Sequence, residues 1–327
     1  MDHGSTMQHY ILDNASSAER RQGSWGWIVA VVVALVLIGA LIWWLVRSRE
    51  HTPEAEVPAA ESTTHSAVDL TTGKSESSAT PRPSPPETTQ PNPGMESLLR
   101  QAAAAQQQGD LLKARELGLN VYRQTEAQPS LQRRAEEILN TVNIELVLSP
   151  RDMPEKQDYT VRSGDSLAKL AKQFGTTVEL LQKSNNIRGS MIRIGDRLRI
   201  FTGAFSILVD KSDNELLLMM NGDFFKRYRV GTGEFNKTPV GEFTITDRIA
   251  QPTWWRPDGR EIPYGDPENL LGTHWLALNV RGYGIHGTWE PDTIGHQLSA
   301  GCVRMLNENV EELFTLVTLG TPVEIRD

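Results

Sequence analysis

The most apolar stretch of the chain runs from Trp25 to Val46, where 22 consecutive residues carry no charge. At a rise of ~1.5 Å per residue, a helix of that length spans ~33 Å, which matches a hydrocarbon core of ~30 Å. Tryptophans lie at both ends of the stretch, as in the interfacial belts of membrane helices. The pattern predicts a single transmembrane helix over residues 25–46, after a tail over residues 1–24.

The pattern changes after the apolar stretch, because residues 47–94 are rich in Pro, Ser, Thr and Glu. Six prolines lie close together between Pro81 and Pro93. Such a segment has too little apolar content to build a core, so we expect a disordered linker.

Helical periodicity marks residues 95–149, where apolar positions recur at steps of three and four, as in Leu131, Ala135, Ile138 and Val142. Gly109-Asp110 and Pro129-Ser130 interrupt the pattern, which predicts a small α-helical segment of two or three helices. Helical repeats need about three copies to be stable, and one is present here. A spacer or a self-association surface is therefore favoured over a peptide-binding groove.

Residues 157–201 begin with a strand-like Tyr159–Val161, a turn at Gly164–Leu167 and a helix with apolar residues at i, i+3, i+4 and i+7. Gly175 stands where a helix C-terminus favours a residue that tolerates positive φ. A second short helix leads through Asn185–Ile187 to a final strand that ends at residue 200.

These features resemble a complete LysM module. The resemblance implies a βααβ fold that binds glycan containing N-acetylglucosamine. It places the binding residues in the two turns, at Gly164, Asp165, Ser166, Leu167, Asn185, Asn186 and Ile187. The alternative is a small structural domain without affinity, because a fold alone does not guarantee a working site.

Strand-like runs fill residues 204–327, and Asn221-Gly222 is typical of a two-residue hairpin turn. The predicted strands cover residues 205–209, 215–220, 224–230, 242–246, 275–280 and 323–325, and a helix is predicted over residues 308–318. This part is therefore expected to be a mostly-β domain.

The only cysteine, Cys302, lies in Ser299-Ala300-Gly301-Cys302-Val303-Arg304, sixteen residues after His286. One cysteine excludes an internal disulfide. A thiol becomes a good nucleophile when a nearby imidazole takes its proton. Small neighbours leave the sulfur uncrowded and are poor core material, which favours a reactive thiol over a buried one.

Three of the seven histidines fall in the predicted folded part of the C-terminal half, namely His274, His286 and His296. His286 follows a predicted strand and opens a Gly-containing turn, so we favour it as the base, with His296 as the second choice. A zinc site is disfavoured, because no two of the three histidines and Cys302 lie closer than six residues.

The segments Ile285-His286-Gly287-Thr288 and Ser299–Arg304 resemble the signature of the L,D-transpeptidase family of bacterial cell-wall enzymes. Thr238–Phe243, after Gly231-Thr232-Gly233, resembles an upstream element of the same family, so the likeness covers roughly residues 204–327. The resemblance implies a β-sandwich catalytic domain. Ala300 departs from the usual signature, which has a second histidine at that position.

The family resemblance also implies a mechanism and a set of site residues. Cys302, activated by His286, attacks the carbonyl of the third residue of a tetrapeptide stem, expels D-Ala, and passes the acyl group to an amine as a 3→3 crosslink. The supporting groups are the main-chain amides of Cys302 and Gly301 for the oxyanion, Gly287 or Thr288 for orienting the imidazole, Ser299 for the turn, and Arg304 for a stem carboxylate or a loop ion pair. Neither a metal nor a cofactor is required.

Four aromatic residues between the two motifs are candidates for a substrate lid, or else pack a loop onto the sheet: Trp254, Trp255, Tyr264 and Trp289. The formal net charge of −8 disfavours nucleic acid as a partner. Arginines flank both ends of the predicted span, so charge alone does not orient it.

The expected partners are peptidoglycan, through its stem peptides and glycan, and the membrane, through the one predicted helix. Wall-directed domains place the N-terminus in the cytoplasm and the C-terminal domains outside the bacterial cytoplasmic membrane. The alternatives are an L,D-endopeptidase or carboxypeptidase, a lipoprotein-attaching transferase of the same fold, and a tether without catalytic activity.

Overall fold

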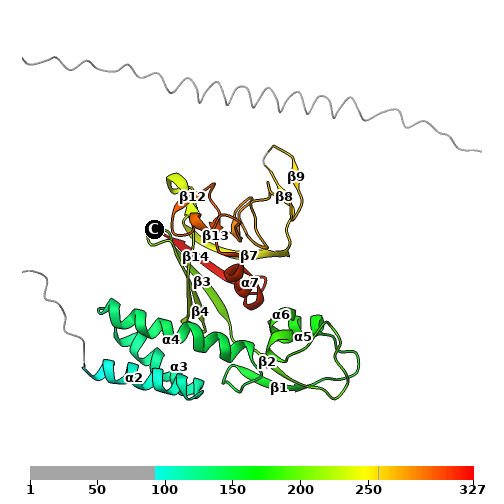
Figure 1. The fold of residues 1–327 in the computed structure, drawn as a ribbon. Helices are drawn as coiled ribbons and strands as arrows, with labels where there is room; N and C mark the ends of the chain where they lie inside the picture. Colours follow the sequence, from blue (N-terminus) through cyan, green and yellow to red (C-terminus); the bar gives the residue numbers. More distant parts are fainter. Residues whose placement is uncertain (1–92, 257) are drawn as a thin grey trace, which may run out of the picture. The chain divides into compact units, whose positions relative to one another are not determined.

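The structure is a computed structural model that describes residues 93–256 and 258–327 (Figure 1). The predicted tail at 1–24, the predicted transmembrane helix at 25–46 and nearly all of the predicted linker at 47–94 lie outside the described residues. Of the helices between Pro93 and Asp327, none combines the length and the apolar character needed to cross a membrane.

Three helices form the N-terminal part of the described chain, α2 (Pro93–Gln107), α3 (Leu111–Gln124) and α4 (Pro129–Leu148). The breaks fall where the sequence predicts them. The Asp110 carboxylate accepts a hydrogen bond from the Lys113 amide at the start of α3, and a proline opens α4. The predicted apolar face of α4 is buried, from Leu131 at 1% exposure to Val142 at 0%.

The LysM segment has the predicted βααβ order, with β1 (Lys156–Thr160), α5 (Leu167–Phe174), α6 (Val178–Ser184) and β2 (Arg197–Phe201). The two strands pair antiparallel. The Ser166 hydroxyl caps α5 by accepting from the Lys169 amide, and Gly175 ends that helix at a φ of 66°. The predicted helix and its C-terminal glycine are both confirmed.

The C-terminal part is built on a sheet of eight strands in the order β13-β11-β10-β7-β14-β3-β4-β5. Its strands are β3 (Phe205–Asp210), β4 (Glu215–Met220), β5 (Asp223–Arg229), β7 (Gly241–Ala250), β10 (His274–Leu278), β11 (Gly284–His286), β13 (Val303–Arg304) and β14 (Pro322–Arg326). The prediction of a mostly-β domain is confirmed. The long strand β7 pairs with β14 through its first half and with β10 through its second, and so joins the two halves of the sheet.

Two small ribbons complete this part. β6 (Thr232–Gly233) pairs in parallel with β12 (Gln297–Ser299), and β8 (Trp254–Trp255) pairs antiparallel with β9 (Glu261–Ile262). Figure 1 shows the β8–β9 ribbon projecting from the end of the sheet. These short strands were not predicted, because two or three residues carry too little periodicity to be seen in a sequence.

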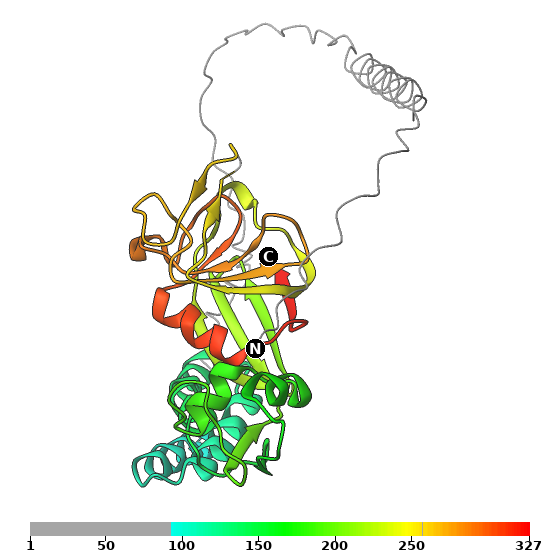
Figure 2. The same cartoon turned by 90° about the vertical axis from the view of Figure 1, so that its right-hand side faces the viewer.

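Helix α7 (Asn307–Leu316) packs against β10 and β11 and contributes Val310 and Leu313 to the core. Its C-terminal end contacts the LysM segment, as Figure 2 shows. The Thr177 hydroxyl donates to the Thr315 carbonyl at 2.5 Å, and Arg248 lies over the ring of Phe314.

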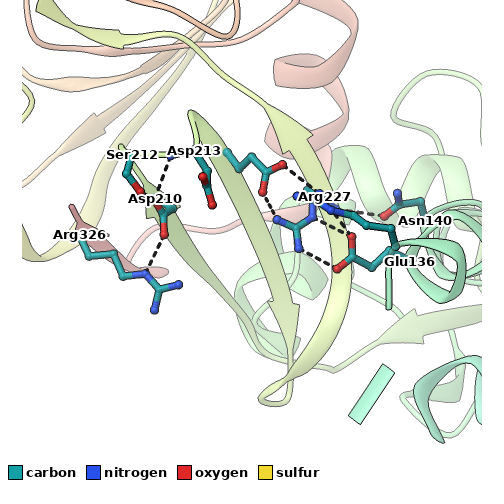
Figure 3. Close-up of polar contacts among 9 residues, drawn as sticks. Glu136, Asn140, Asp210, Ser212, Asp213, Arg227 and Arg326 are labelled. Carbon is teal, nitrogen blue, oxygen red and sulfur yellow. Dashed lines mark hydrogen bonds and ion pairs between the residues drawn. The ribbon is translucent and has the colours of Figure 1, made fainter. Parts of the chain in front are cut away.

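Helix α4 packs against β5, the last strand of the sheet, through a buried ion-pair network (Figure 3). Glu136 is 3% exposed, and both of its oxygens accept hydrogen bonds from the guanidinium of Arg227 at 2.7 and 2.8 Å. Arg227 also pairs with Glu215 on β4. The expectation of a helical spacer is therefore wrong, because a spacer would not bury a carboxylate against the C-terminal sheet.

Two asparagines of α4 bind the main chain of β5 along its open side. The Asn140 carbonyl oxygen accepts from the Arg227 amide at 3.1 Å, and the Asn143 amide donates to the Phe225 carbonyl at 2.8 Å. These are edge groups that no neighbouring strand pairs.

Figure 3 also shows Asp210, the last residue of β3, whose carboxylate accepts hydrogen bonds from Ser212 and from Arg326.

Candidate active site

Cys302 lies in the turn between β12 and β13, and Ser299 holds that turn. The Ser299 hydroxyl donates to the Cys302 carbonyl at 2.6 Å and accepts from the Gly301 amide at 3.1 Å. Gly301 has a φ of 131°, and a Cβ there would lie 2.8 Å from the ring of Tyr283. The turn therefore requires glycine before the cysteine, both for its backbone conformation and for space.

The amide of Gly301 is already used by Ser299, so it is not free to bind an oxyanion. The predicted role of that amide is wrong for this conformation of the turn. The Cys302 amide has no hydrogen-bond partner among the described residues. It is therefore the main-chain donor of this turn that remains open to a developing negative charge.

His286 ends strand β11, and its side chain is only 4% exposed. Its Nδ1 lies 2.6 Å from the Gly287 carbonyl oxygen. A carbonyl only accepts, so Nδ1 carries the proton and Nε2 is unprotonated in the neutral ring. The main chain of Gly287 thus orients the ring, as predicted for one of the two candidates.

Strand register places the thiol and the imidazole on one face of the sheet. β11 and β13 are parallel, with Ile285 opposite Val303 and His286 opposite Arg304. Ile285 and Val303 point into the core at 0% and 1% exposure. Because side chains alternate along a strand, His286 and Cys302 point to the other face.

The tryptophan of strand β10 completes this face. Trp275 is directly opposite His286 in the antiparallel pair, and the two rings stack with centroids 5.7 Å apart. Trp275 also lies against Gly284, where a Cβ would overlap its ring. The imidazole of His286 is therefore held between a main-chain carbonyl and an aromatic ring.

Burial sets the protonation of both groups. It lowers the pKa of His286 to about 4, although hydrogen bonds with the main chain of Gly287 and Leu271 oppose that shift. Burial likewise raises the pKa of the Cys302 thiol, while the Gly284 main chain and the charge of Arg304 act to lower it. At neutral pH the thiol and the imidazole are consequently both neutral.

The thiol donates a long hydrogen bond to the Gly282 carbonyl, at 3.6 Å from sulfur to oxygen. No hydrogen bond joins Cys302 to His286 in the structure. The raised pKa of the Cys302 thiol and the lowered pKa of the His286 imidazole both oppose a stable thiolate in the resting structure.

A cavity of about 480 Å³ opens at Cys302. Its wall includes Trp275 and both tryptophans of the β8–β9 ribbon, together with Ile249, Gln251, Pro252, Thr253, Leu271 and Gly282. Of the four predicted lid aromatics, Trp254 and Trp255 line this cavity. Tyr264 and Trp289 instead pack on one another at 6.3 Å.

Arg304 is held by contacts with Gly231 and Glu290. Its main chain exchanges two hydrogen bonds of 2.8 Å with Gly231, and its guanidinium pairs with Glu290 at 3.1 Å. The Thr288 hydroxyl accepts from the Glu290 amide, so it fixes the same loop and does not orient the imidazole. Arg304 Nε is buried and has no partner among the described residues.

The upstream Thr-Pro-Val-Gly-Glu-Phe element, which begins at Thr238, contacts the cysteine turn through Gly233. The Thr238 hydroxyl accepts from the Gly233 amide at 2.7 Å and is 1% exposed. A Cβ on Gly233 would lie 2.8 Å from the Cα of Gly301. The two predicted motifs therefore meet at a contact between two glycines.

The other histidines lie elsewhere. His274 points to the opposite face of β10, where its ring packs on Phe314 at 4.5 Å. His296 is exposed, and its carbonyl accepts from the Thr232 amide. In the part of the chain that the structure describes, no three His, Cys, Asp or Glu side chains gather closely enough to hold a metal ion.

The first predicted glycan-binding turn uses its side chains internally. Leu167 is in the core at 2% exposure, and Ser166 caps α5. The Asp165 carboxylate accepts from the Tyr159 hydroxyl and the Arg162 amide. The Gly164 carbonyl accepts from Lys169. The main chain of this turn is what faces solvent.

The three residues of the second predicted glycan-binding turn, Asn185–Ile187, differ in whether they are free to bind a ligand. Asn185 bonds to both main-chain groups of Arg199, so it ties α6 to β2 and is not free for a ligand. Asn186 and Ile187 line a hollow of about 720 Å³ together with Gln182, Lys183, Arg188, Gly189 and, from α4, Leu148.

Sequence patterns did not point to two further residues near the site. Asn269 is 1% exposed and binds the carbonyls of Pro252 and Ile262 and the amide of Leu271. Asn307, the first residue of α7, accepts from the Thr273 amide at 3.1 Å. The only signal for Asn307 was its place at the start of the helix predicted after the cysteine.

Comparison with known proteins agrees with both motif assignments. The L,D-transpeptidase catalytic domain matches residues 204–325, and the LysM domain matches residues 159–201. The YkuD protein of Bacillus licheniformis, which is named as an L,D-transpeptidase, is 34% identical over 175 residues that cover 51% of this chain and 97% of that protein.

Two proteins of Bacillus subtilis with the same activity in their names are also similar. YkuD is 33% identical over 174 residues, which cover 51% of this chain and 97% of that protein. YqjB is 35% identical over 127 residues, which cover 37% of this chain and 70% of that protein.

Proposed function

The chain belongs to the L,D-transpeptidase family, and from that premise we propose that it forms 3→3 crosslinks between peptidoglycan stem peptides through a thioester on Cys302. The observation that carries the proposal is that Cys302 lies in the wall of a cavity whose adjoining face bears the stacked rings of Trp275 and His286.

In the first half-reaction the Cys302 sulfur bonds to the carbonyl carbon of the third stem residue as the thiol proton passes to Nε2 of His286. The Cys302 amide binds the oxyanion. The bond to the terminal D-Ala then breaks, and the imidazolium returns the proton to the leaving amine. The result is a thioester, free D-Ala and a neutral imidazole.

In the second half-reaction the side-chain amine of a neighbouring stem attacks the thioester carbonyl and gives a proton to His286. The carbon–sulfur bond breaks, and the thiolate recovers that proton. The Trp254–Trp255 ribbon beside the cavity supports an amine as the acceptor in place of water, because apolar side chains next to the thioester exclude water from it.

The LysM segment serves in this proposal to hold the enzyme on the glycan of its substrate. The hollow at Asn186 and Ile187 supports that assignment, together with the exposed main chain of the turn at Gly164. The predicted span at 25–46 would anchor the chain in the bacterial cytoplasmic membrane and keep the catalytic domain on its outer side, near the wall.

The test uses the full-length chain with tetrapeptide muropeptides. We expect mass spectrometry to find a stem adduct on Cys302 with loss of D-Ala, followed by crosslinked dimers. Cys302→Ala should give neither product. His274→Gln is the matched control, because that ring lies on the opposite face of β10, and it should retain both products.

Dimers formed by Cys302→Ala would contradict the catalytic assignment. An adduct that yields only free tripeptide would make water the acceptor and would contradict the crosslinking half of the proposal.

A further inference from the structure

The ring of His286 is oriented by the main chain, so whatever holds that main chain also holds the base. The Gly287 carbonyl accepts the Nδ1 proton at 2.6 Å. The neighbouring loop at Leu271–Thr273 runs beside the same turn, where the Gly287 amide donates to the His274 carbonyl. The turn at Gly287 lies after the end of β11, and the loop at Leu271–Thr273 lies before the start of β10, so strand pairing does not fix the conformation of either segment.

One carboxamide lies between the two turns. The side-chain oxygen of Asn307 accepts from the Thr273 amide at 3.1 Å and lies 3.5 Å from the Thr273 hydroxyl. A Cβ added to Gly272 or to Gly287 would overlap this same oxygen. Both glycines are therefore required by the closeness of Asn307, and Gly272 also by its φ of 64°.

The position of Asn307 in its own helix is consistent with a role outside that helix. It is the first residue of α7, after Leu306, which provides no side-chain cap. Asparagine is favoured just before a helix, where it accepts an amide of its own helix. Here its oxygen turns away to the loop before β10, and the start of α7 is left without that bond.

We propose that Asn307 is a positioning residue for His286: its carboxamide oxygen fixes the Gly272 and Gly287 turns, and through the Gly287 carbonyl it sets the tautomer and tilt of the imidazole. The inference deepens the proposed function and rests on it in so far as His286 is the base. Asn307 makes no contact with the thiol, so its effect passes through the histidine.

The kinetic test compares Asn307→Ala, Asn307→Asp and Glu308→Gln in the full-length chain. Removing the oxygen should lower kcat for crosslinking about 10- to 100-fold and leave KM within about twofold, because the ring loses its alignment and the cavity keeps its wall. Glu308 is exposed and one residue away, so Glu308→Gln should match the wild type.

Asn307→Asp keeps an acceptor oxygen and suits the start of a helix, so it should fold and recover most of kcat. Its negative charge should also raise the pKa of His286 and move the acid limb of the pH profile upward. An Asp variant as slow as the Ala variant, with an unmoved acid limb, would overturn the proposal.

A second readout needs no substrate. Side-chain ¹⁵N NMR of His286 should show the Nδ1-protonated tautomer in the wild type and a mixture of tautomers in Asn307→Ala. An Ala variant with wild-type kcat and a single Nδ1-protonated tautomer would refute the role of Asn307. If the wild type makes no crosslinks, the proposed function fails, yet the tautomer measurement still decides the positioning role.

Discussion

The two edges of the eight-stranded sheet differ in how they are closed. At one edge β5 is seven residues long, and α4 covers it with a buried ion pair and two asparagines that bind its open main chain. At the other edge β13 is two residues long, and its outer side is closed only by the bridge between Arg304 and Gly231.

The difference separates an edge that is closed by packing from an edge that stays open beside the proposed nucleophile. A long uncovered strand invites pairing with other chains, so β5 is covered by a helix from an earlier part of the chain. The short β13 cannot pair far, and the turn before it leaves the Cys302 amide and thiol open to a ligand. Changes at the two edges should therefore separate activity from folding.

The largest effect is expected at the catalytic edge. His286→Gln removes the proposed proton acceptor and should lower the rate of thioester formation about 10²- to 10⁴-fold, with a small change in Tm. The measurement is adduct formation on Cys302 by mass spectrometry, set beside a thermal melt. A rate within tenfold of the wild type would mean that another group accepts the proton.

The covered edge should show the reverse behaviour. Glu136→Ala leaves Arg227 without its buried partner and should cost about 3–5 kcal/mol of unfolding free energy, while kcat of the folded fraction stays unchanged. Urea unfolding measures the loss. Glu137→Ala, at the exposed neighbouring position, is the control and should cost under about 0.5 kcal/mol. Equal costs in the two variants would mean that the network adds nothing.

A smaller effect is expected from pH, and at the catalytic edge alone. Protonation removes the base, so activity should fall as pH drops through the His286 pKa of about 4. At pH 5 an imidazole with an ordinary pKa of ~6.5 would be roughly 3% neutral, so a roughly 30-fold loss would be expected, whereas His286 should keep nearly full activity.

The same shift has a consequence for folding. The unfolded chain binds the proton more tightly, so this histidine should reduce stability as pH falls from about 6.5 to about 4.

A pH profile of kcat/KM in wild type and in His274→Gln measures the effect of pH on activity. An acid limb near 6.5 in both would show that the buried ring is not the titrating base.

Sequence patterns predicted the elements with strong periodicity and the residues with distinctive chemistry. The helix breaks at Asp110 and Pro129, the cap at Gly175 and the Asn221-Gly222 turn all appear in the structure, because each reflects a local conformational preference. The family assignment came from the spacing of short motifs around His286 and Cys302. The membrane span at 25–46 stays a prediction.

Contacts between distant residues were not predictable in the same way. Asn143 and Asn307 look alike in the sequence, as polar residues in or next to a predicted helix. Only their positions against Phe225 and Thr273 show that one closes a strand edge and the other holds the loop behind the base. The Gly301 amide likewise could not be ruled out as an oxyanion donor until the Ser299 hydroxyl was placed on it.

The amino-acid sequence by itself determined that this protein has one thiol, a short list of candidate imidazoles led by His286, a LysM pattern and a mostly-β C-terminal part, because residue chemistry and local periodicity are properties of short segments. The tertiary structure decided which backbone groups remain open, how far burial shifts each pKa, and which face each side chain shares. These properties depend on strand register and on packing between segments as far apart in the chain as Thr177 and Thr315, which are separated by 138 residues, and no local pattern encodes them.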